Sequence, residues 1–560
     1  MYILNIYTSK LRWLGLKKVI SGSIIVTLVA TPWINSDALI IPKIIVLVAL
    51  AAYFLPTLIG GYKSLITDNK TKFLTIISIL FITQMVAVIL KSDAPWEQQF
   101  FGRTGRGLGF LTYFALIIIM IYVAKIIKFS DLSKISLGLL VSCWLSSSYS
   151  ILQFFGIDFW DWATATNGII GTIGNPNNQS SFVAIALIPS VTYLWSRRSR
   201  LISIPIILTI LLFTLYICES TQGYIALFTS IMIFILMYLW YSNRKVVFYV
   251  TFFATLFAGF TAIAGMLNKG PFSYYLYKVS VQSRGEMWQT ASTIVKNNPI
   301  FGVGLDSLGD YSLMYRSEKT ANGIAEYIDN CHNFLLQFAA TGGVFLALTY
   351  LGIITLTLYS FFMIQKQIGK FDMLLSSIFA AWVSFQLQSI ISPAVIPTLL
   401  WNFIICGAVI GVSSNFNSDG NLVRNSNNVS IKNSESSTIG TLGVISLLLS
   451  LTITLPLFNA DKLARQANIK KDALLAVKAA KMYPESVIIY SRLGIDLYES
   501  GLYDLSLDIA RSAVKFNPNS YQTWILILVN PNAESEERRK AKEELMKIDP
   551  FNKLIQNYKI

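Results

Sequence analysis

Long apolar runs recur along most of this chain, and they restrict its fold more than any other feature. A helix crosses a bilayer with about 20 mostly apolar residues. The chain is 54% hydrophobic and only 13% charged, whereas soluble domains usually carry about 25% charged residues. We find about thirteen such runs, near 19–35, 38–59, 73–90, 107–124, 135–155, 179–195, 201–218, 222–241, 246–267, 343–364, 371–391, 396–414 and 439–458. The sequence therefore predicts an all-α polytopic membrane protein with about 12–13 transmembrane helices.

The basic residues between these runs predict the orientation of the chain. Lys and Arg gather at the cytoplasmic ends of spans, and the N-terminal segment is basic. Counting from there, every second loop is basic too, whereas loops 36–37, 156–178, 219–221 and 392–395 hold no Lys or Arg. The basic set is Lys10, Arg12, Lys17, Lys18, Lys63, Lys70, Lys72, Lys125, Lys128, Lys134, Arg197, Arg198, Arg200, Arg244, Lys245, Lys366, Lys370, Arg424 and Lys432. We expect a multi-pass protein of the bacterial inner membrane with a cytoplasmic N-terminus, and the net charge of +15 needs no nucleic acid to explain it.

Two loops on the predicted outer side break this rule. Loop 91–106 carries Lys91, Arg103 and Arg106, the two arginines within a glycine-rich stretch, Gly-Arg-Thr-Gly-Arg-Gly, at 102–107. Loop 268–342 is also basic, although long loops cross the membrane largely regardless of charge. Arginine at the start of a span is best tolerated when an anion holds it. Contact with lipid headgroups and binding of a phosphate group are both open explanations.

The C-terminal part of the chain has a different character. Residues 415–438 are rich in Ser and Asn and predict a flexible cytoplasmic linker, and the last span at 439–458 would carry residues 459–560 to the periplasm. In that tail the similar three-residue segments Met-Tyr-Pro, Phe-Asn-Pro and Ile-Asp-Pro end at Pro484, Pro518 and Pro550. These prolines are 34 and 32 residues apart. This period resembles tetratricopeptide repeats, whose stacked helix pairs bind a partner. An unrelated bundle of helical hairpins is the alternative.

Candidate chemistry centres on His332, the single histidine of the chain. A neutral imidazole transfers protons near neutral pH, although a lone histidine is more often structural. Arg284 lies in the same predicted outer loop. We predict no metal and no cofactor. Asp306, Asp310 and Asp329 could gather a cation, but their spacing does not require one.

Several short motifs, taken in order, resemble the O-antigen ligase / O-antigen polymerase superfamily, which includes bacterial protein O-oligosaccharyltransferases. They are Gly-Thr-Ile-Gly-Asn-Pro-Asn at 171–177, Arg284 with Trp288, Asn-Pro-Ile-Phe-Gly-Val-Gly at 298–304, His332-Asn333, and Thr-Gly-Gly at 341–343. The resemblance covers residues 19–414. It implies transfer of a glycan from an undecaprenyl-pyrophosphate carrier at the periplasmic face, without a metal.

The resemblance also implies roles for single residues. Arg284 would grip the pyrophosphate, and His332 would orient or deprotonate the acceptor hydroxyl or help to bind the diphosphate. We expect further substrate contacts from Arg103, Arg106, Asn333, Asn175, Asn177 and Gln222. Gln222 departs from the family, because ligases often carry an arginine near this position. Either the donor site differs from that of the family at this point, or Arg103 or Arg106 makes the donor contact instead.

Three hypotheses about function remain. The first is a ligase, whose acceptor is a glycan, lipid or protein, with the tail binding a protein partner; a polymerase would differ only in its acceptor. The second, a polysaccharide exporter or flippase, requires ionisable residues within the spans, and Lys43 is the clearest of few. The third, a scaffold that presents the tail, leaves His332 and Arg284 in one loop unexplained.

Overall fold

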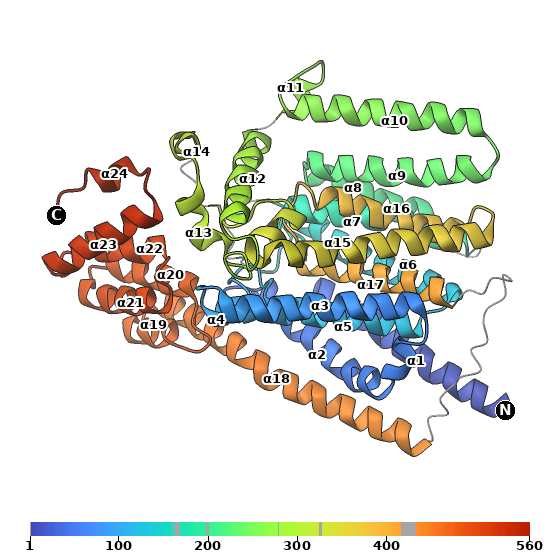
Figure 1. Cartoon of the computed structure of the whole chain (residues 1–560), viewed down its shortest axis with the longest axis horizontal. Coiled ribbons are helices and arrows are strands. Elements are labelled where there is room, and N and C mark those ends of the chain that lie inside the picture. The colour runs from blue at the N-terminus through green and yellow to red at the C-terminus, as the bar shows by residue number, and fades with distance from the viewer. Residues whose placement is uncertain are drawn as a thin grey trace.

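The computed structural model of the chain (Figure 1) describes residues 2–160, 162, 168–197, 201–277, 279–323, 328–415 and 433–560. Side chains at 2–11, 279–282, 319, 322–323 and 433–439 fall outside this description. Several residues of the charge pattern and most of the predicted linker 415–438 therefore lie outside the described residues. Those basic residues are Arg198, Arg200, Arg424 and Lys432, and of Lys10 the side chain alone falls outside the description.

A helix stands at each of the thirteen predicted runs. These helices are α1 (Tyr2–Leu28), α2 (Ile40–Gly60), α3 (Asn69–Lys91), α5 (Phe110–Ile126), α6 (Leu132–Phe154), α7 (Pro176–Trp195), α8 (Ser203–Ile217), α9 (Thr221–Tyr241), α10 (Lys245–Met266), α15 (Phe334–Ile368), α16 (Met373–Gln388), α17 (Ile396–Ser414) and α18 (Asn433–Lys470). In the described part of the chain, eight helices are long and apolar enough to cross a membrane, and α5, α8 and α16 are shorter apolar helices. The same residues contain no strand. The prediction of an all-α polytopic membrane protein is confirmed.

The first helix differs from its predicted run, which extended to residue 35. α1 ends at Leu28, and the chain then turns around Thr31, whose carbonyl accepts the N–H groups of Ile34 and Asn35 at 3.0 and 3.1 Å. Pro32 has no N–H to continue the helical bonding. Hydrophobicity alone did not show this early end.

Helix α17 lies at the centre of the bundle. Its apolar segment is entirely buried, and it packs against α5, α15 and α3. Trp401 on α17 is 1% exposed, and its Nε1 donates to Thr27 Oγ1 of α1 at 3.1 Å. Helix α10 is the opposite case, because none of its apolar segment is buried and it runs along the edge of the bundle (Figure 1).

Contacts between loops sort them into two faces. On one face Arg12 pairs with Asp131 at 2.8 Å, and Lys70 Nζ donates to Ser413 Oγ at 2.6 Å. On the other face Gly105 N–H donates to Asp37 Oδ2 at 2.8 Å. Loops predicted to share a side of the membrane thus contact one another. Which face meets the cytoplasm stays a prediction from charge.

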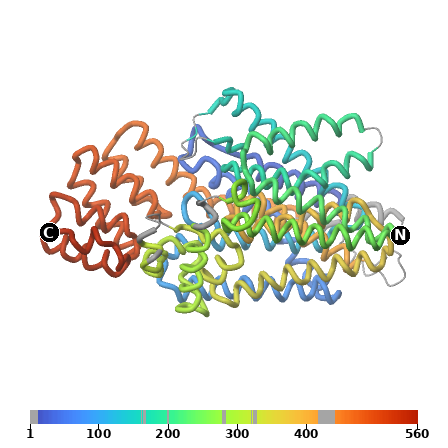
Figure 2. Tube along the Cα trace, turned by 90° about the horizontal axis from the view of Figure 1, so that it is seen from above, coloured from blue at the N-terminus to red at the C-terminus, as the bar shows by residue number. Residues whose placement is uncertain are grey.

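The remaining helices lie at the end of the bundle that carries Asp37 and Gly105. They are α4 (Trp96–Phe101), α11 (Ser273–Leu276), α12 (Val279–Asn297), α13 (Leu308–Tyr315) and α14 (Glu318–Gly323), followed by the tail helices α19 (Ala473–Ala480), α20 (Val487–Glu499), α21 (Tyr503–Phe516), α22 (Tyr521–Val529), α23 (Ser535–Ile548) and α24 (Lys553–Gln556). Helix α18 packs along α2 and continues without a break into the tail. Figure 2 shows the tail at one end of the bundle and the start of the chain at the other. We call the end that carries the tail the outer end.

The tail is packed onto the long loop between α10 and α15. Leu313 of α13 is buried in the same apolar cluster as Leu507, Trp524 and Leu545 of the tail. Arg316 next to α13 forms a buried ion pair with Asp549 at 2.8 Å, the two side chains being 6% and 2% exposed. The tail helices pack in sequence-adjacent pairs, α20 with α21 and α22 with α23. Their identity as tetratricopeptide repeats stays a prediction.

Candidate active site

His332 lies in a tight turn at the outer end, directly before α15. Its N–H donates to Asn330 Oδ1 at 2.8 Å, and the preceding Cys331 N–H donates to Gln337 Oε1 at 3.0 Å. These bonds hold His332 at φ 55°, a left-handed conformation that is uncommon for a residue with a β-carbon. Backbone strain of this kind clusters at functional sites.

Two arginines and one carboxylate act on the His332 imidazole. Burial, together with the positive charges of Arg284 and Arg106, lowers the pKa of His332 to about 4, although Asp329 acts in the opposite direction. Desolvation and nearby cations both disfavour the imidazolium form, so the ring is neutral at pH 7. Its Nδ1 is buried and has no hydrogen-bond partner within the described residues. The geometry therefore presents a neutral imidazole beside positive charge.

Arg106 is held by Asp329. The guanidinium donates from Nε to Oδ2 at 3.0 Å and from Nη2 to Oδ1 at 2.6 Å. Burial acts to raise the pKa of Asp329, but the charge and hydrogen bonds of Arg106 outweigh it and lower the pKa. Asp329 is 43% exposed on its other side, so this pair stands at the surface of the site.

Arg103 is held more deeply, by two further aspartates. Its Nη1 lies 2.7 Å from Asp310 Oδ1, and the two side chains are 4% and 2% exposed. Its backbone N–H donates to Asp306 Oδ2 at 2.8 Å, which also accepts the Leu108 N–H at 3.1 Å. The glycine-rich loop thus wraps around the Asp306 carboxylate.

These pairs account for the two arginines by which loop 91–106 breaks the charge rule. Each arginine of loop 91–106 meets an aspartate of loop 268–342, so the anion that we expected is part of the protein itself. The sequence also allowed Asp306, Asp310 and Asp329 to gather a cation. They accept hydrogen bonds from the 103–108 segment instead, and the described residues contain no cluster of three or more possible metal ligands. The donor contacts of Arg103 and Arg106 stay predictions.

Arg284 differs from these two arginines. It lies on α12, is half-buried, and forms no ion pair with an acidic side chain of the described residues. Burial lowers the pKa of its guanidinium. A charged group that is partly desolvated and lacks a counter-ion attracts an anion. Arg284 is therefore the arginine of this cluster that is best suited to an incoming phosphate.

The motifs at 298–304 and 341–343 build the joint that supports the His332 turn. Helix α15 is kinked at Gly343, whose φ of 80° and ψ of 167° are non-helical. The opened backbone pairs with the other motif: Val344 N–H donates to Pro299 O at 2.8 Å, and Val303 N–H donates to Ala340 O at 3.0 Å. A β-carbon at Gly343 would collide with Ile300 O. Only glycine fits this junction.

Asn175, Asn177 and Gln222 form a second cluster, where α7 and α9 begin. Asn175 Oδ1 accepts the Asn177 N–H at 2.8 Å, and Asn177 Oδ1 accepts the Ser220 hydroxyl at 2.7 Å. Gln222 is 7% exposed, and its Nε2 has no partner in the described part of the chain. Asn333 has a similar structural task, because its Oδ1 caps α15 by accepting the Leu336 N–H at 3.0 Å. Substrate contacts of these four residues stay predictions.

Sequence reasoning missed the residues that hold the arginines and the turn. Asp310 and Asp329 are 207 and 223 residues away from their partners, so no local spacing could link them. Asn517 of the tail donates to Asp310 Oδ2 at 2.9 Å and was not considered. The available signal was the presence of charges of opposite sign in the two loops that break the charge rule.

Comparison with known proteins identifies the central part of the chain. Residues 206–351 match a family model described as O-Antigen ligase. The match runs from α8 into α15 and includes Gln222, Arg284, His332 and Asn333. No curated protein matches the chain. The match covers residues 206–351 and supports a place for the chain in the O-antigen ligase superfamily.

Proposed function

We propose that the chain transfers a glycan from an undecaprenyl-pyrophosphate-linked donor to an acceptor at the periplasmic face, as an O-antigen ligase does. The family match supports lipid-linked glycan transfer in general. One observation carries the finer proposal: a neutral His332 stands beside Arg284, a half-buried arginine without a carboxylate partner among the described residues. A base and an anion site are the two parts that this reaction needs.

The reaction replaces one bond to the anomeric carbon by another. The acceptor hydroxyl oxygen attacks that carbon, the bond from the carbon to the phosphate oxygen breaks, and undecaprenyl pyrophosphate leaves. The hydroxyl proton passes to the His332 imidazole. Arg284 stabilises the negative charge that develops on the departing pyrophosphate, and in many enzymes such charge stabilisation contributes most of the rate enhancement. We propose that arginine supplies this charge without a metal.

The low pKa of His332 fits an imidazole that becomes a base only when the donor is present. Without substrate, Arg284 and Arg106 disfavour the imidazolium. A bound pyrophosphate would cancel their charge, because an opposite charge within about 4–6 Å favours the charged form of a group. The pKa then rises toward the value at which general base catalysis is efficient.

The test is transfer by the purified full-length protein, given the lipid-linked donor pool of the producing cells. His332→Ala should reduce transfer by roughly 100-fold or more, the contribution of a positioned general base. Lys296→Ala, at an exposed position on α12, is the control and should transfer normally. The product separates a ligase from a polymerase, because a polymerase lengthens the lipid-linked glycan itself. Normal transfer by His332→Ala would remove the histidine from the reaction.

A further inference from the structure

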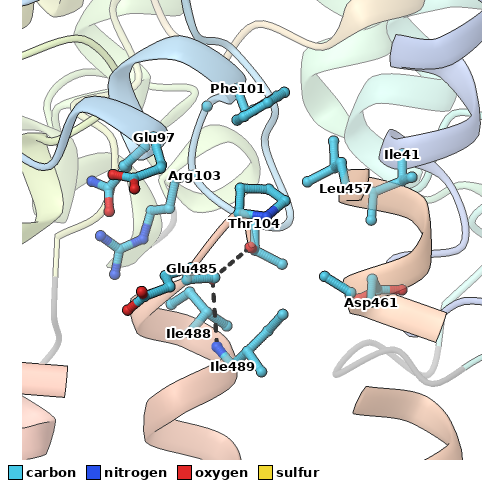
Figure 3. A pocket seen from close by; sticks show the side chains of 15 residues that line it. Ile41, Glu97, Phe101, Arg103, Thr104, Leu457, Asp461, Glu485, Ile488 and Ile489 are labelled. Atoms are coloured by element: carbon cyan, nitrogen blue, oxygen red, sulfur yellow. Dashed lines mark hydrogen bonds between the residues drawn. The ribbon is translucent and has the colours of Figure 1, made fainter. Parts of the chain in front are cut away.

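A cavity of ≈ 230 Å³ lies between the tail and the outer end of the bundle. Its walls come from loop 36–39, from Thr104 and Gly105 of the glycine-rich loop, and from the tail helices α18 and α20. Figure 3 shows the smaller pocket beside it, which shares Thr104, Asp461, Ile488 and Ile489. The cavity therefore exists only because the tail is docked.

Hydrogen bonds fix the walls of this cavity relative to one another. The Asp461 carboxylate of α18 accepts the Ser36 N–H at 2.7 Å and the Asp37 N–H at 3.1 Å. Thr104 Oγ1 lies 2.7 Å from Ser486 Oγ, a bond that Figure 3 marks with a dashed line. These bonds cross from the bundle to the tail, so the cavity is a built part of the fold.

The polar groups that line the cavity are only partly used. Arg492 lines the cavity and donates from Nη2 to Ser36 Oγ at 3.1 Å, its one side-chain hydrogen bond to the described residues, although a guanidinium carries five N–H groups. The two Asp37 carboxylate oxygens accept one N–H each, from Ile40 at 3.1 Å and Gly105 at 2.8 Å. A carboxylate oxygen can accept two hydrogen bonds. The lining thus offers both a donor and acceptors to a ligand.

The cavity lies directly behind the arginine loop of the candidate active site. Gly105 lines it, and the next residue, Arg106, reaches Asp329 and acts on the His332 imidazole. A ligand in the cavity would contact the loop that carries Arg106. Asp37 and Asp461 disfavour an anion there, and Arg492 disfavours a cation.

We propose that this cavity binds a sugar ring of one of the two glycans that take part in transfer. Hydroxyl groups both donate and accept hydrogen bonds, as the unused groups of Arg492 and Asp37 require. The apolar face of a sugar ring can pack against Leu39 and Ile488, which also line the cavity. Most ligand sites combine apolar walls with a few placed polar groups. This inference rests on the proposed function, and it gives the tail a share in the substrate site.

Two variants test the proposal. Arg492→Ala removes the donor, and Ile488→Trp fills the cavity from a half-buried position on α20. The matched controls are Arg511→Ala, on the exposed Arg511–Glu537 pair of the tail, and Ile495→Trp, at a 38% exposed position on the same helix α20. Unfolding temperatures of all four proteins show whether the tail stays folded.

Binding is measured first, without turnover, in the His332→Ala background. The probe is the soluble oligosaccharide released by mild acid from the lipid-linked donor pool, detected by saturation-transfer NMR. Arg492→Ala should weaken an interaction at this site by about tenfold, the effect of losing one hydrogen bond to a charged group. Ile488→Trp should weaken it at least as much by occupying the cavity, while the controls bind normally. In the transfer assay, the same two variants should raise KM about tenfold for one substrate.

The outcomes show which glycan occupies the cavity, and they separate a failure of the cavity proposal from a failure of the proposed function. An increase in the KM of the donor identifies the donor glycan as the occupant, and an increase in the KM of the acceptor identifies the acceptor glycan. Saccharide binding without transfer by wild-type protein would overturn the proposed function and leave the cavity proposal standing. If the wild-type protein is active and neither cavity variant changes the saccharide affinity or the KM, the cavity proposal is overturned. If saccharide binding weakens only in variants whose unfolding temperature also falls, the cavity proposal is overturned as well.

Discussion

At the scale of single residues, the site contains three arginines that are held in three different ways. Arg103 is buried against Asp310, and Arg106 faces the half-exposed Asp329. Arg284 has no ion pair within the described residues and adds its charge to the field at His332. A buried ion pair contributes to structure, because removing one partner is costly. We therefore propose Arg284 as the anion site and a supporting role for Arg103.

Replacing Arg284 with Lys tests this assignment. Lysine keeps the charge but loses the planar fork that binds phosphate through two hydrogen bonds. We expect kcat/KM for the lipid-linked donor to fall by roughly ten- to hundredfold, the worth of one hydrogen bond to a charged group, with an unchanged unfolding temperature. Lys296→Ala on the same helix should match wild type. A fully active Arg284→Lys protein would show that the arginine has only a structural role.

At the scale of helices, the decisive element is the kinked α15. Its opened backbone at Gly343 receives segment 299–304, and Gln84 of α3 secures the joint by donating to Ile300 O at 2.7 Å and to Gly342 O at 2.9 Å. The turn that carries His332 lies at the start of the same helix. The joint therefore anchors the helix whose first residues follow the His332 turn.

Gly343→Ala should damage this joint. A side chain there collides with Ile300 O and must adopt φ 80° and ψ 167°, a conformation nearly confined to glycine that costs roughly 1–3 kcal/mol even without the collision. We expect a lower unfolding temperature and reduced transfer. Gly352→Ala on the same helix is the control, because its β-carbon meets Ile77 only at ordinary contact distance, 3.4 Å. Equal stability of the two variants would contradict the strained joint.

How far the sequence could predict the fold depends on the distance over which each signal acts. The apolar runs are local, and all of them became helices. The glycines at 302 and 343 were recognised as a motif, but their meeting at one joint was not, because 41 residues separate the two positions along the chain. Charge partners such as Arg106 and Asp329 depend on the packing of distant loops. His332 and the arginines stood out by residue type and by the charge rule, the other site residues came from the resemblance, and the surroundings of all of them came only from the structure.

At the scale of the whole molecule, the tail is part of the outer end and not a separate appendage. It contributes Asn517 to the Asp310 carboxylate that holds Arg103, and Asp549 to Arg316 of the long loop. Sequence reasoning expected the tail to recruit or position a partner, and a partner-binding surface remains a prediction. The contacts show in addition that the tail supports the loops that carry the arginines.

Asp549→Ala tests this support. The change leaves Arg316 charged and buried, which costs about 3–5 kcal/mol for a buried pair. We expect a clear fall in unfolding temperature and weaker transfer, since α13 and its loop lose their anchor. Asp508→Ala, which breaks the exposed Lys481–Asp508 pair of the tail, should change both little. If both variants behave alike, the tail does not support the site.

The central claim is that the His332 imidazole is neutral without substrate and that a bound pyrophosphate raises its pKa, so that it can act as a base. Because His332 is the single histidine of the chain, NMR of protein labelled with ¹⁵N-histidine and purified without a histidine tag follows this imidazole alone. We predict a titration midpoint at a pKa of about 4 without ligand, and a rise toward the ordinary value of about 6.5 when undecaprenyl pyrophosphate is added. A midpoint near 6.5 that does not respond to undecaprenyl pyrophosphate would contradict the account.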